Sequence, residues 1–265
     1  MIDLHSHIIS GVDDGSEDIE MSLEIAKLYV ENGIDKVVCT PHYIEGAISY
    51  TPEELKIKIE ELKKELFQAT IPLEIYPGNE IYINPSIVGK ILEVQALTIN
   101  NSRYTLIELP MNDMPIYVKD VIYELRLKGI RPIIAHPERN SRVVNDPNIL
   151  YELINMGALV QLNLPSLGGM YGDRVRDTGM KLLQHNMVHF VGTDTHTNRR
   201  RSPKVGKFLD ILSTIVTDKD FEALTIGNPQ SVLDNKEIEI KPPIKIKKKD
   251  IKLSSLIGLF TAFQQ

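Results

Sequence analysis

Histidines and carboxylates recur along this chain directly after short apolar runs, where strands of a sheet would end. Ten residues share this position: His5, His7, Asp13, Asp14, His42, Glu80, Glu108, His136, Asp194 and His196. Residues two apart in a strand lie on one face, so His5 and His7 can converge on one ion. Asp194 and His196 repeat that spacing. Imidazole mixed with carboxylate suits Mn²⁺, Zn²⁺ or Fe, so the pattern indicates a metal centre.

The size of this set indicates more than one ion. A single histidine at a strand end is more often a structural residue, and we assign His185 and His189 to that class. The remaining five histidines would all have to be structural at once, together with their carboxylates. Two or three ions that share a bridging carboxylate account for the set. Such a cluster activates a water molecule as nucleophile and neutralises charge on a phosphoryl oxygen.

Arginines that could hold a phosphate follow two of the same positions. Arg139 lies three residues after His136, and the run Arg199, Arg200 and Arg201 comes soon after His196. A guanidinium group binds phosphate in a bidentate manner. Arg139 is the stronger candidate, because it shares a loop with a proposed ligand. Among the three consecutive arginines, the residue that contacts phosphate stays open at this point.

The elements that must position these side chains alternate between strands and helices. Apolar, β-branched runs predict strands at 34–40, 73–76, 104–109, 132–135, 158–163 and 188–192, after an opening strand in the first residues. Helical spacing predicts helices at 20–31, 118–128, 148–156, 174–185 and 203–214, and Thr51-Pro52 begins another. This alternation implies that the strands are parallel. Seven parallel strands suit an α/β barrel, in which active sites lie at the carboxyl ends of the strands. An open doubly wound sheet is the alternative.

Composition and motifs exclude several other classes of protein. Of 265 residues, 42% are apolar and 25% are charged, as in a globular protein with a sizeable core. The net charge of −6 argues against nucleic-acid binding. The single cysteine, Cys39, stands in an apolar strand, and the sixth residue after it is Glu45 rather than the arginine of a thiol-based tyrosine phosphatase. No Gly-x-Ser-x-Gly motif and no Walker-type loop occurs.

The two ends of the chain give further expectations. No basic region followed by an apolar one is present at the start, and no run of about 18 apolar residues occurs, so we expect a cytoplasmic protein. The composition changes after Asn235, which divides the chain into a barrel at 1–235 and a tail at 236–265. The tail joins a lysine-rich stretch to an apolar one. It is a solvated extension, an oligomer contact or a weak contact with anionic lipid.

Several of these motifs resemble a known family. Asp-Leu-His-Ser-His at 3–7, Asp-Asp-Gly at 13–15, Thr-Pro-His at 40–42 and Asp-Thr-His at 194–196 resemble the PHP (polymerase and histidinol phosphatase) superfamily. Gly-Asn-Glu-Ile at 78–81, the stretch 101–108 and Ala-His-Pro-Glu-Arg at 135–139 resemble its bacterial protein-tyrosine phosphatases. Those enzymes accompany capsule and exopolysaccharide synthesis in Gram-positive bacteria.

The resemblance implies a fold, a metal centre and a substrate. The fold is a distorted seven-strand (β/α) barrel, the centre is trinuclear and usually contains Mn²⁺, and the substrate is phosphotyrosine on a partner tyrosine kinase. The matching metal ligands are His5, His7, Asp14, His42, Glu80, Glu108, His136, Asp194 and His196. Arg139 and Arg201 match the phosphate-binding arginines.

The implied reaction is direct attack of a metal-activated hydroxide on phosphorus. Arg139 and Arg201 would offset charge in the transition state, and Asp194 or His196 would relay a proton to the phenolate. Phenolate has a pKa near 10 and therefore needs little help from an acid. The alternatives are a small-molecule phosphatase, such as histidinol-phosphate phosphatase, with a lidded pocket, and a non-catalytic binding protein, which the complete ligand set opposes.

Overall fold

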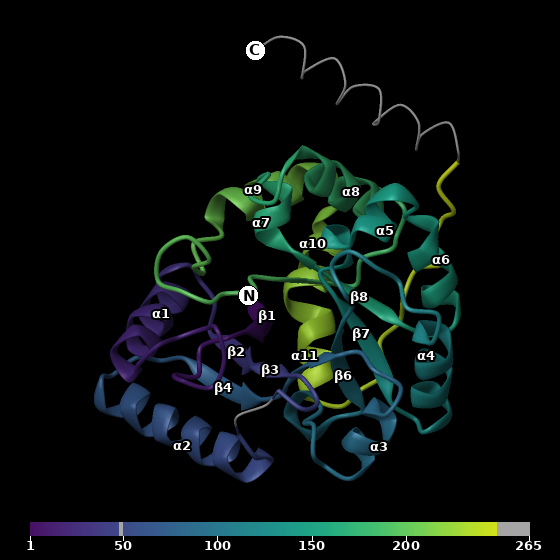
Figure 1. Cartoon of the computed structure of the whole chain (residues 1–265). Coiled ribbons are helices and arrows are strands. Elements are labelled where there is room, and N and C mark those ends of the chain that lie inside the picture. Colours follow the sequence, from purple (N-terminus) through teal and green to yellow (C-terminus); the bar gives the residue numbers. More distant parts are fainter. Residues whose placement is uncertain (48–49, 248–265) are drawn as a thin grey trace.

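Strands form the centre of the protein and helices surround them (Figure 1). The computed structural model describes residues 1–47 and 50–247. All strand pairs are parallel, and they form a sheet of order β1-β2-β4 and a sheet of order β3-β5-β6-β7-β8-β9. The chain is therefore a mixed α/β protein with parallel sheets, as the alternation of its elements predicts.

The strands are short, and most of their residues are buried. They are β1 (Ile2–Ser6), β2 (Lys36–Cys39), β3 (His42–Tyr43), β4 (Glu74–Pro77), β5 (Glu80–Tyr82), β6 (Tyr104–Glu108), β7 (Arg131–Ala135), β8 (Leu159–Asn163) and β9 (Phe190–Gly192). The α-helices are α1 (Ile19–Glu31), α2 (Pro52–Gln68), α3 (Ile87–Leu92), α4 (Val118–Leu127), α5 (Ser141–Asn145), α6 (Asn148–Asn155), α7 (Leu164–Leu167), α8 (Asp173–Gln184), α9 (Gly206–Ile215), α10 (Asp218–Glu222) and α11 (Asn228–Leu233). Two 3-10 helices, η1 (Ile99–Asn101) and η2 (Pro137–Arg139), and a π-helix, η3 (Ala223–Gly227), complete the set.

Every predicted strand is present, but two of them break and then continue as a second short strand. β2 continues as β3 after Thr40 and Pro41, and β4 continues as β5 after Gly78 and Asn79. Pro41 has no N–H to donate to a neighbouring strand. Gly78 approaches Val38 so closely that a Cβ would lie 2.9 Å from its Cγ1. Because of the breaks, the described residues contain nine strands in place of the seven predicted.

Hydrogen bonds also join the first strand to the segment after the last one. His7 N donates to Thr195 O at 2.8 Å, and Asp194 N donates to His5 O at 3.1 Å. At the other end of β1, the buried Asp3 carboxylate accepts hydrogen bonds from Thr193 N at 3.2 Å and from Thr193 Oγ1 at 2.5 Å. The end of β1 and the exit of β9 therefore lie side by side.

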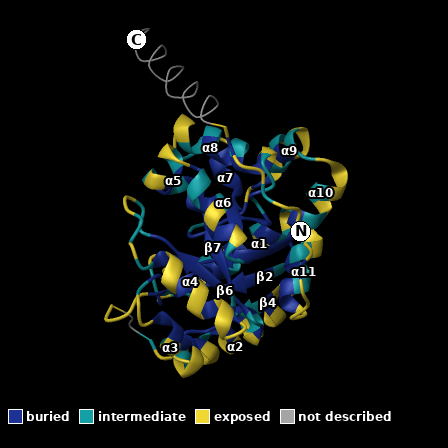
Figure 2. Ribbon diagram, turned by 90° about the vertical axis from the view of Figure 1, so that its right-hand side faces the viewer, coloured by how far each residue is buried: buried dark blue, intermediate teal, exposed yellow. Residues whose placement is uncertain are grey.

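Apolar packing holds the helices against the strands. The strands are buried and the outer faces of the helices are exposed (Figure 2). One cluster joins α1, α2 and α9 to β2 and β9, and a second joins α3, α4 and α6 to β6 and β8. A third places α11 against residues of β1, β6 and β9, and its members include Leu4, Leu106, Phe190 and Val232.

The long helices match their predicted positions, and the short ones were not predicted. Thr51 caps α2 in a reciprocal arrangement, because its Oγ1 accepts from Glu54 N at 3.2 Å and Glu54 Oε2 accepts from Thr51 N at 2.7 Å. The helix predicted at 203–214 begins later, at Gly206. Helices α3, α5, α7, α10 and α11 have between four and six residues, too few to show a helical period in the sequence.

The first part of the predicted tail packs on the body of the protein. Asn148 Oδ1 accepts from Ile246 N at 2.9 Å, and the Ile246 side chain is buried. The domain boundary at residue 235 stays a prediction, and the apolar end of the tail lies outside the described residues. Within 1–47 and 50–247, no helix has the length and apolar character needed to cross a membrane.

His189 generates a prediction about acid stability. Its Nδ1 accepts from Val160 N at 3.0 Å, and burial together with the charge of Arg131 lowers the pKa of His189 to about 3. Between about pH 3 and the ordinary imidazole value of 6.5, the unfolded chain binds a proton that the folded chain excludes. The stability contribution is therefore complete above pH 6.5 and is lost as the pH falls.

We expect His189→Asn to reduce this acid sensitivity, because the Asn oxygen can still accept from Val160 N. From pH 7 to pH 5, the free energy of unfolding should fall by about 2 kcal/mol more in the wild type than in the variant. Urea denaturation of chelated protein at the two pH values measures this difference. An equal loss in both proteins would contradict the assignment.

Candidate metal centre

The predicted ligands meet at one end of the strands. His5 and His7 lie at the end of β1, His42 in β3, Glu80 in β5 and Glu108 at the end of β6. His136 follows β7, and Asp194 and His196 follow β9. Within each of four overlapping groups, one ligand atom per residue lies within 4.8 Å of the others. The groups are His7, Asp14, His42 and His196; His5, His7 and Glu80; His5, His136 and Asp194; and His42, Glu80 and Glu108. The structure thus brings together all nine residues predicted as metal ligands.

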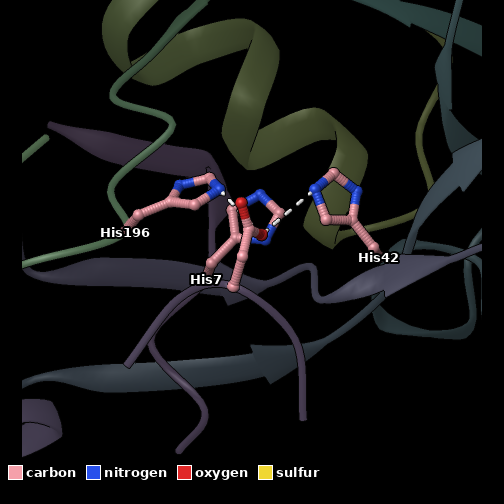
Figure 3. A group of neighbouring side chains, drawn as sticks. His7, His42 and His196 are labelled. Carbon is pink, nitrogen blue, oxygen red and sulfur yellow. Dashed lines mark ion pairs between the residues drawn. The ribbon is translucent and has the colours of Figure 1, made fainter. Parts of the chain in front are cut away.

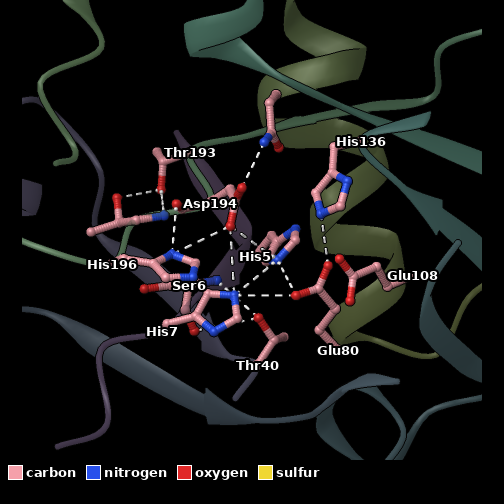
Figure 4. Close-up of polar contacts among 12 residues, drawn as sticks. His5, Ser6, His7, Thr40, Glu80, Glu108, His136, Thr193, Asp194 and His196 are labelled. Atoms are coloured by element: carbon pink, nitrogen blue, oxygen red, sulfur yellow. Dashed lines mark hydrogen bonds and ion pairs between the residues drawn. The ribbon is translucent and has the colours of Figure 1, made fainter. Parts of the chain in front are cut away.

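Glu80 contacts four imidazoles of the cluster, and Figure 4 shows three of them, His5, His7 and His136. Its Oε2 atom lies 3.2 Å from His5 Nε2, 3.3 Å from His7 Nε2 and 3.1 Å from His42 Nδ1. Its Oε1 atom lies 2.8 Å from His136 Nε2. Within the described residues, Oε2 is buried and has no partner in hydrogen-bonding geometry. A carboxylate oxygen among imidazole nitrogens in this way is suited to bridging cations.

The two carboxylate oxygens of Asp194 have different surroundings. Oδ2 accepts hydrogen bonds from Arg139 Nη1 at 2.9 Å, Arg201 Nη2 at 2.7 Å and Asn163 Nδ2 at 2.8 Å. Oδ1 lies 3.5 Å from His5 Nε2 and from His196 Nδ1, without a hydrogen-bond partner in the part of the chain described. Asp194 therefore contacts the arginines with one oxygen and faces the imidazoles with the other.

Asp13 and Asp14, which the residues alone did not distinguish, have separate positions. Asp14 Oδ1 lies 3.4 Å from His42 Nε2 and 3.3 Å from His196 Nε2. Figure 3 shows the rings of His42 and His196 on either side of His7. Asp13 Oδ2 instead accepts from His7 Nδ1 at 2.7 Å and so directs the other ring nitrogen of His7 into the cluster. At Gly15, a Cβ would lie 2.2 Å from His7 O, so this tight loop requires glycine. The geometry places Asp14 in the cluster and Asp13 behind it.

Two residues of β8 that the sequence analysis missed support the cluster. Gln161 Oε1 lies 2.9 Å from His5 Nδ1 and can accept its proton, which leaves the His5 Nε2 lone pair facing Glu80. Gln161 Nε2 donates to Asn163 Oδ1 at 2.9 Å, and Asn163 in turn holds Asp194. A sequence signal existed, because two amides spaced two residues apart in an apolar strand repeat the pattern of His5 and His7.

The backbone is strained at two of the candidate ligands. His136 has a φ angle of 31° and Asp194 a φ angle of 53°, both in the left-handed region that side-chain-bearing residues rarely adopt. His136 directly follows the end of β7, and Asp194 follows soon after the end of β9. Such strain is maintained where surrounding contacts over-determine the conformation, and it is frequent in functional sites.

The charges within the cluster shift the pKa values of its members. Burial lowers the pKa of His5, but the carboxylates of Glu80 and Asp194 more than offset this and raise it above its ordinary value. Burial raises the pKa of Glu80, yet the imidazoles of His5 and His136 hold it well below its usual range. Burial and the charge of Glu80 raise the pKa of Glu108 to about 7. A proton and a cation compete for the same nitrogen of His5, so metal binding there would release a proton.

The arginines differ in their relation to the cluster. Arg139 and Arg201 both bind Asp194, and their side chains are 19% and 27% exposed, so they line the rim. Arg139 also lies over the ring of Tyr171, with its guanidinium carbon 4.4 Å from the ring centre. The Arg199 and Arg200 side chains are exposed at the surface. Arg201 is therefore the one of the three consecutive arginines that the structure places against the candidate site.

Cys39 belongs to none of the ligand groups within the described residues. It is buried in β2, and burial raises the pKa of its thiol to about 12, so almost no thiolate forms at neutral pH. His185 and His189, assigned to structural roles from the sequence, belong to none of the four ligand groups of the described chain.

Comparison with known proteins identifies the family. Residues 1–234 match the family described as capsular polysaccharide synthesis, CpsB/CapC. This chain belongs to the CpsB/CapC family. The tyrosine-protein phosphatase YwqE of Bacillus subtilis is 33% identical over 255 residues, which cover 95% of this chain and 98% of the relative. The tyrosine-protein phosphatase CpsB of Streptococcus agalactiae is 31% identical, over 89% of this chain and 99% of its own.

A solved structure gives the same relationship. One solved chain superimposes on this protein with a TM-score of 0.89 and 33% identity. Its structure is described together with others as that of YwqE from B. subtilis and CpsB from Streptococcus pneumoniae, metal-dependent tyrosine phosphatases. The match covers 94% of this chain and 100% of that chain. Resemblance to the bacterial protein-tyrosine phosphatases, predicted from the motifs, is thus confirmed for this CpsB/CapC member.

Metal removal should lower the stability of the protein. A cation that binds the folded state alone stabilises it by about 2.7 kcal/mol at one hundred times its dissociation constant. We therefore expect the melting temperature to fall on chelation and to recover when Mn²⁺ is added. His5→Ala should abolish the recovery, whereas His185→Ala, which changes a histidine outside the cluster, should preserve it. Recovery in both variants would place the metal elsewhere.

Proposed function

We propose that this protein is a metal-dependent tyrosine-protein phosphatase. The observation that carries the proposal is Asp194, which joins a cluster of imidazoles and carboxylates to two arginines at the rim. A cation cluster beside a pair of guanidinium groups is suited to a dianionic phosphoryl group. The tyrosine phosphatases among its relatives supply the substrate class.

The proposed cofactor is Mn²⁺, bound as two or three ions, with Zn²⁺ or Fe as alternatives. The donor set fits, because unpartnered oxygens of Glu80 and Asp194 and the unpartnered His42 Nδ1 face one another within the described structure. Glu80 belongs to two of the ligand groups, and its carboxylate could bridge neighbouring ions. When bound, the ions supply an activated water nucleophile and neutralise charge on the phosphoryl oxygens.

The chain's own residues bind and orient the substrate in this proposal. Arg139 and Arg201 offset the negative charge that grows on the phosphoryl oxygens in the transition state. Their attachment to Asp194 Oδ2 fixes both guanidinium groups before substrate arrives. Asp194 or His196 moves a proton toward the phenolate oxygen, a minor contribution for a leaving group whose pKa is near 10.

The proposed partner is a phosphorylated bacterial tyrosine kinase, whose dephosphorylation regulates capsule or exopolysaccharide synthesis in the cytoplasm. The openness of the site supports a protein substrate over a small one. The Asp14 side chain is 65% exposed and the His42 side chain is 22% exposed, so one side of the cluster meets solvent. A small-molecule phosphatase would enclose its substrate more fully.

We also propose that the two sheets form one distorted (β/α)₇ barrel. Counting β2 with β3 and β4 with β5 leaves seven strand positions, and the hydrogen bonds between β1 and the β9 exit support closure. A structure of histidinol phosphate phosphatase from Lactococcus lactis shares the fold, with a TM-score of 0.54 at 15% identity. Residues 1–235 would constitute this barrel and 236–265 its tail.

The substrate is tested by comparing a phosphotyrosine peptide with histidinol phosphate after chelation and re-addition of Mn²⁺. We expect the metal to restore hydrolysis and kcat/KM to favour the peptide. A preference for histidinol phosphate would overturn the substrate while retaining the metal centre. Hydrolysis of neither compound would overturn the phosphatase activity itself.

The arginine assignment predicts different effects for neighbouring residues. Arg201→Lys should lower kcat/KM for a phosphotyrosine peptide by about 100-fold, because lysine cannot reproduce the bidentate contact. Arg200→Lys, a change of the same type at an exposed neighbour, should remain within about twofold of wild type. Equal losses in the two variants would show that Arg201 has no special position.

A further inference from the structure

A cavity of about 370 Å³ adjoins the exposed side of the candidate metal centre. Its lining residues are Val12, Asp13, Asp14, His42, Ile44, Ala47 and Tyr50. Asp14 and His42 belong to one of the ligand groups, so the cavity and the cluster share a wall. A molecule bound at the metals on this side would extend into the cavity.

The lining of the cavity is mixed in chemistry. It combines the carboxylates of Asp13 and Asp14 and the ring of His42 with the apolar side chains of Val12, Ile44 and Ala47 and the ring of Tyr50. Ile44 is 38% exposed, so its aliphatic side chain is accessible to a ligand in the cavity. With cations at the cluster to offset the carboxylates, the matching ligand has an anionic group next to a flat apolar group.

The wall formed by Tyr50 is held in a defined position. Tyr50 Oη donates to His42 O at 2.6 Å and accepts from Asn79 Nδ2 at 3.0 Å. Asn79 Nδ2 also donates to Pro41 O at 3.0 Å, on the same loop that carries His42. The aromatic wall is thus fixed relative to a candidate metal ligand, as a specificity pocket requires.

The depth of the cluster favours a long side chain. His5 and His7 are completely buried, whereas Asp14 at the rim is largely exposed, so a phosphoryl group must descend below the surface. The tyrosine side chain places its oxygen several bonds further from the backbone than that of serine and holds it on a rigid ring. A phosphoserine peptide would meet the rim before its phosphate reached the buried ligands.

We propose that this cavity binds the aromatic ring of the substrate phosphotyrosine, and that Ile44 is the main apolar contact. The inference rests on the proposed function and adds the residues that select aryl over alkyl phosphates. The phosphate would lie at the metal centre and the arginines, and the ring against Ile44 and Val12.

Calorimetric titration of the Mn²⁺-loaded protein with benzylphosphonate and methylphosphonate tests the pocket without turnover. Wild type should bind benzylphosphonate at least about tenfold more tightly, because apolar pocket contacts are worth about 10- to 200-fold. Ile44→Asp should remove most of this preference, because a carboxylate replaces the apolar contact with the ring. Ile44→Leu should retain the preference, as should Ile57→Asp, which alters an exposed isoleucine on α2.

Two results would overturn the pocket. One is equal affinity of the wild type for both phosphonates, and the other is an equal weakening of both by Ile44→Asp. Failure to hydrolyse a phosphotyrosine peptide would overturn the proposed function instead. The aryl preference in binding would still support or overturn the pocket in that case.

Discussion

The structure depends on one constraint: imidazoles and carboxylates are packed together in its buried interior. Buried charges are costly unless opposite charge compensates them, and Glu80 and Asp194 are almost completely buried. The imidazoles of His5 and His136 hold the pKa of Glu80 well below its usual range, and the two rim arginines contact Asp194. The rest of the molecule can be understood as a means of holding these groups together despite their desolvation. Parallel strands achieve it, because all their carboxyl ends open at one side.

Asp194 contacts both the candidate metal ligands and the two proposed phosphate-binding arginines. One of its oxygens faces the imidazoles and the other receives three donors, so a change at this residue affects both the proposed metals and the proposed phosphate contacts. Its left-handed backbone is held by the hydrogen bond from Asp194 N to His5 O and by the Thr193 contacts to Asp3. The strain is therefore stabilised by the junction between the first strand and the exit of the last one.

Behind the candidate ligands, a layer of uncharged or acidic side chains orients the rings. Asp13 holds His7 and Gln161 holds His5, each through Nδ1, so that both Nε2 atoms point inward. Imidazole orientation fixed in this way prepares a site for metal before the metal arrives. On the open side, the cavity beside Asp14 and His42 has an apolar wall. In our proposal, this wall selects aryl over alkyl phosphates, which charge alone cannot do.

The sequence by itself determined the ligand set, the alternation of strands and helices, and the family. The alternation follows from local periods, and the ligand set, with Asp14 and Arg201, follows from motifs that resemble the family. The tertiary structure showed where these side chains lie: Asp14 is in the cluster with Asp13 behind it, and Arg201 contacts Asp194 while its two neighbours are exposed. It also revealed Gln161, whose partner His5 is 156 residues away, and the breaks at Pro41 and Gly78. Contacts between distant segments depend on how strands pack in three dimensions, which residue types and spacing do not specify.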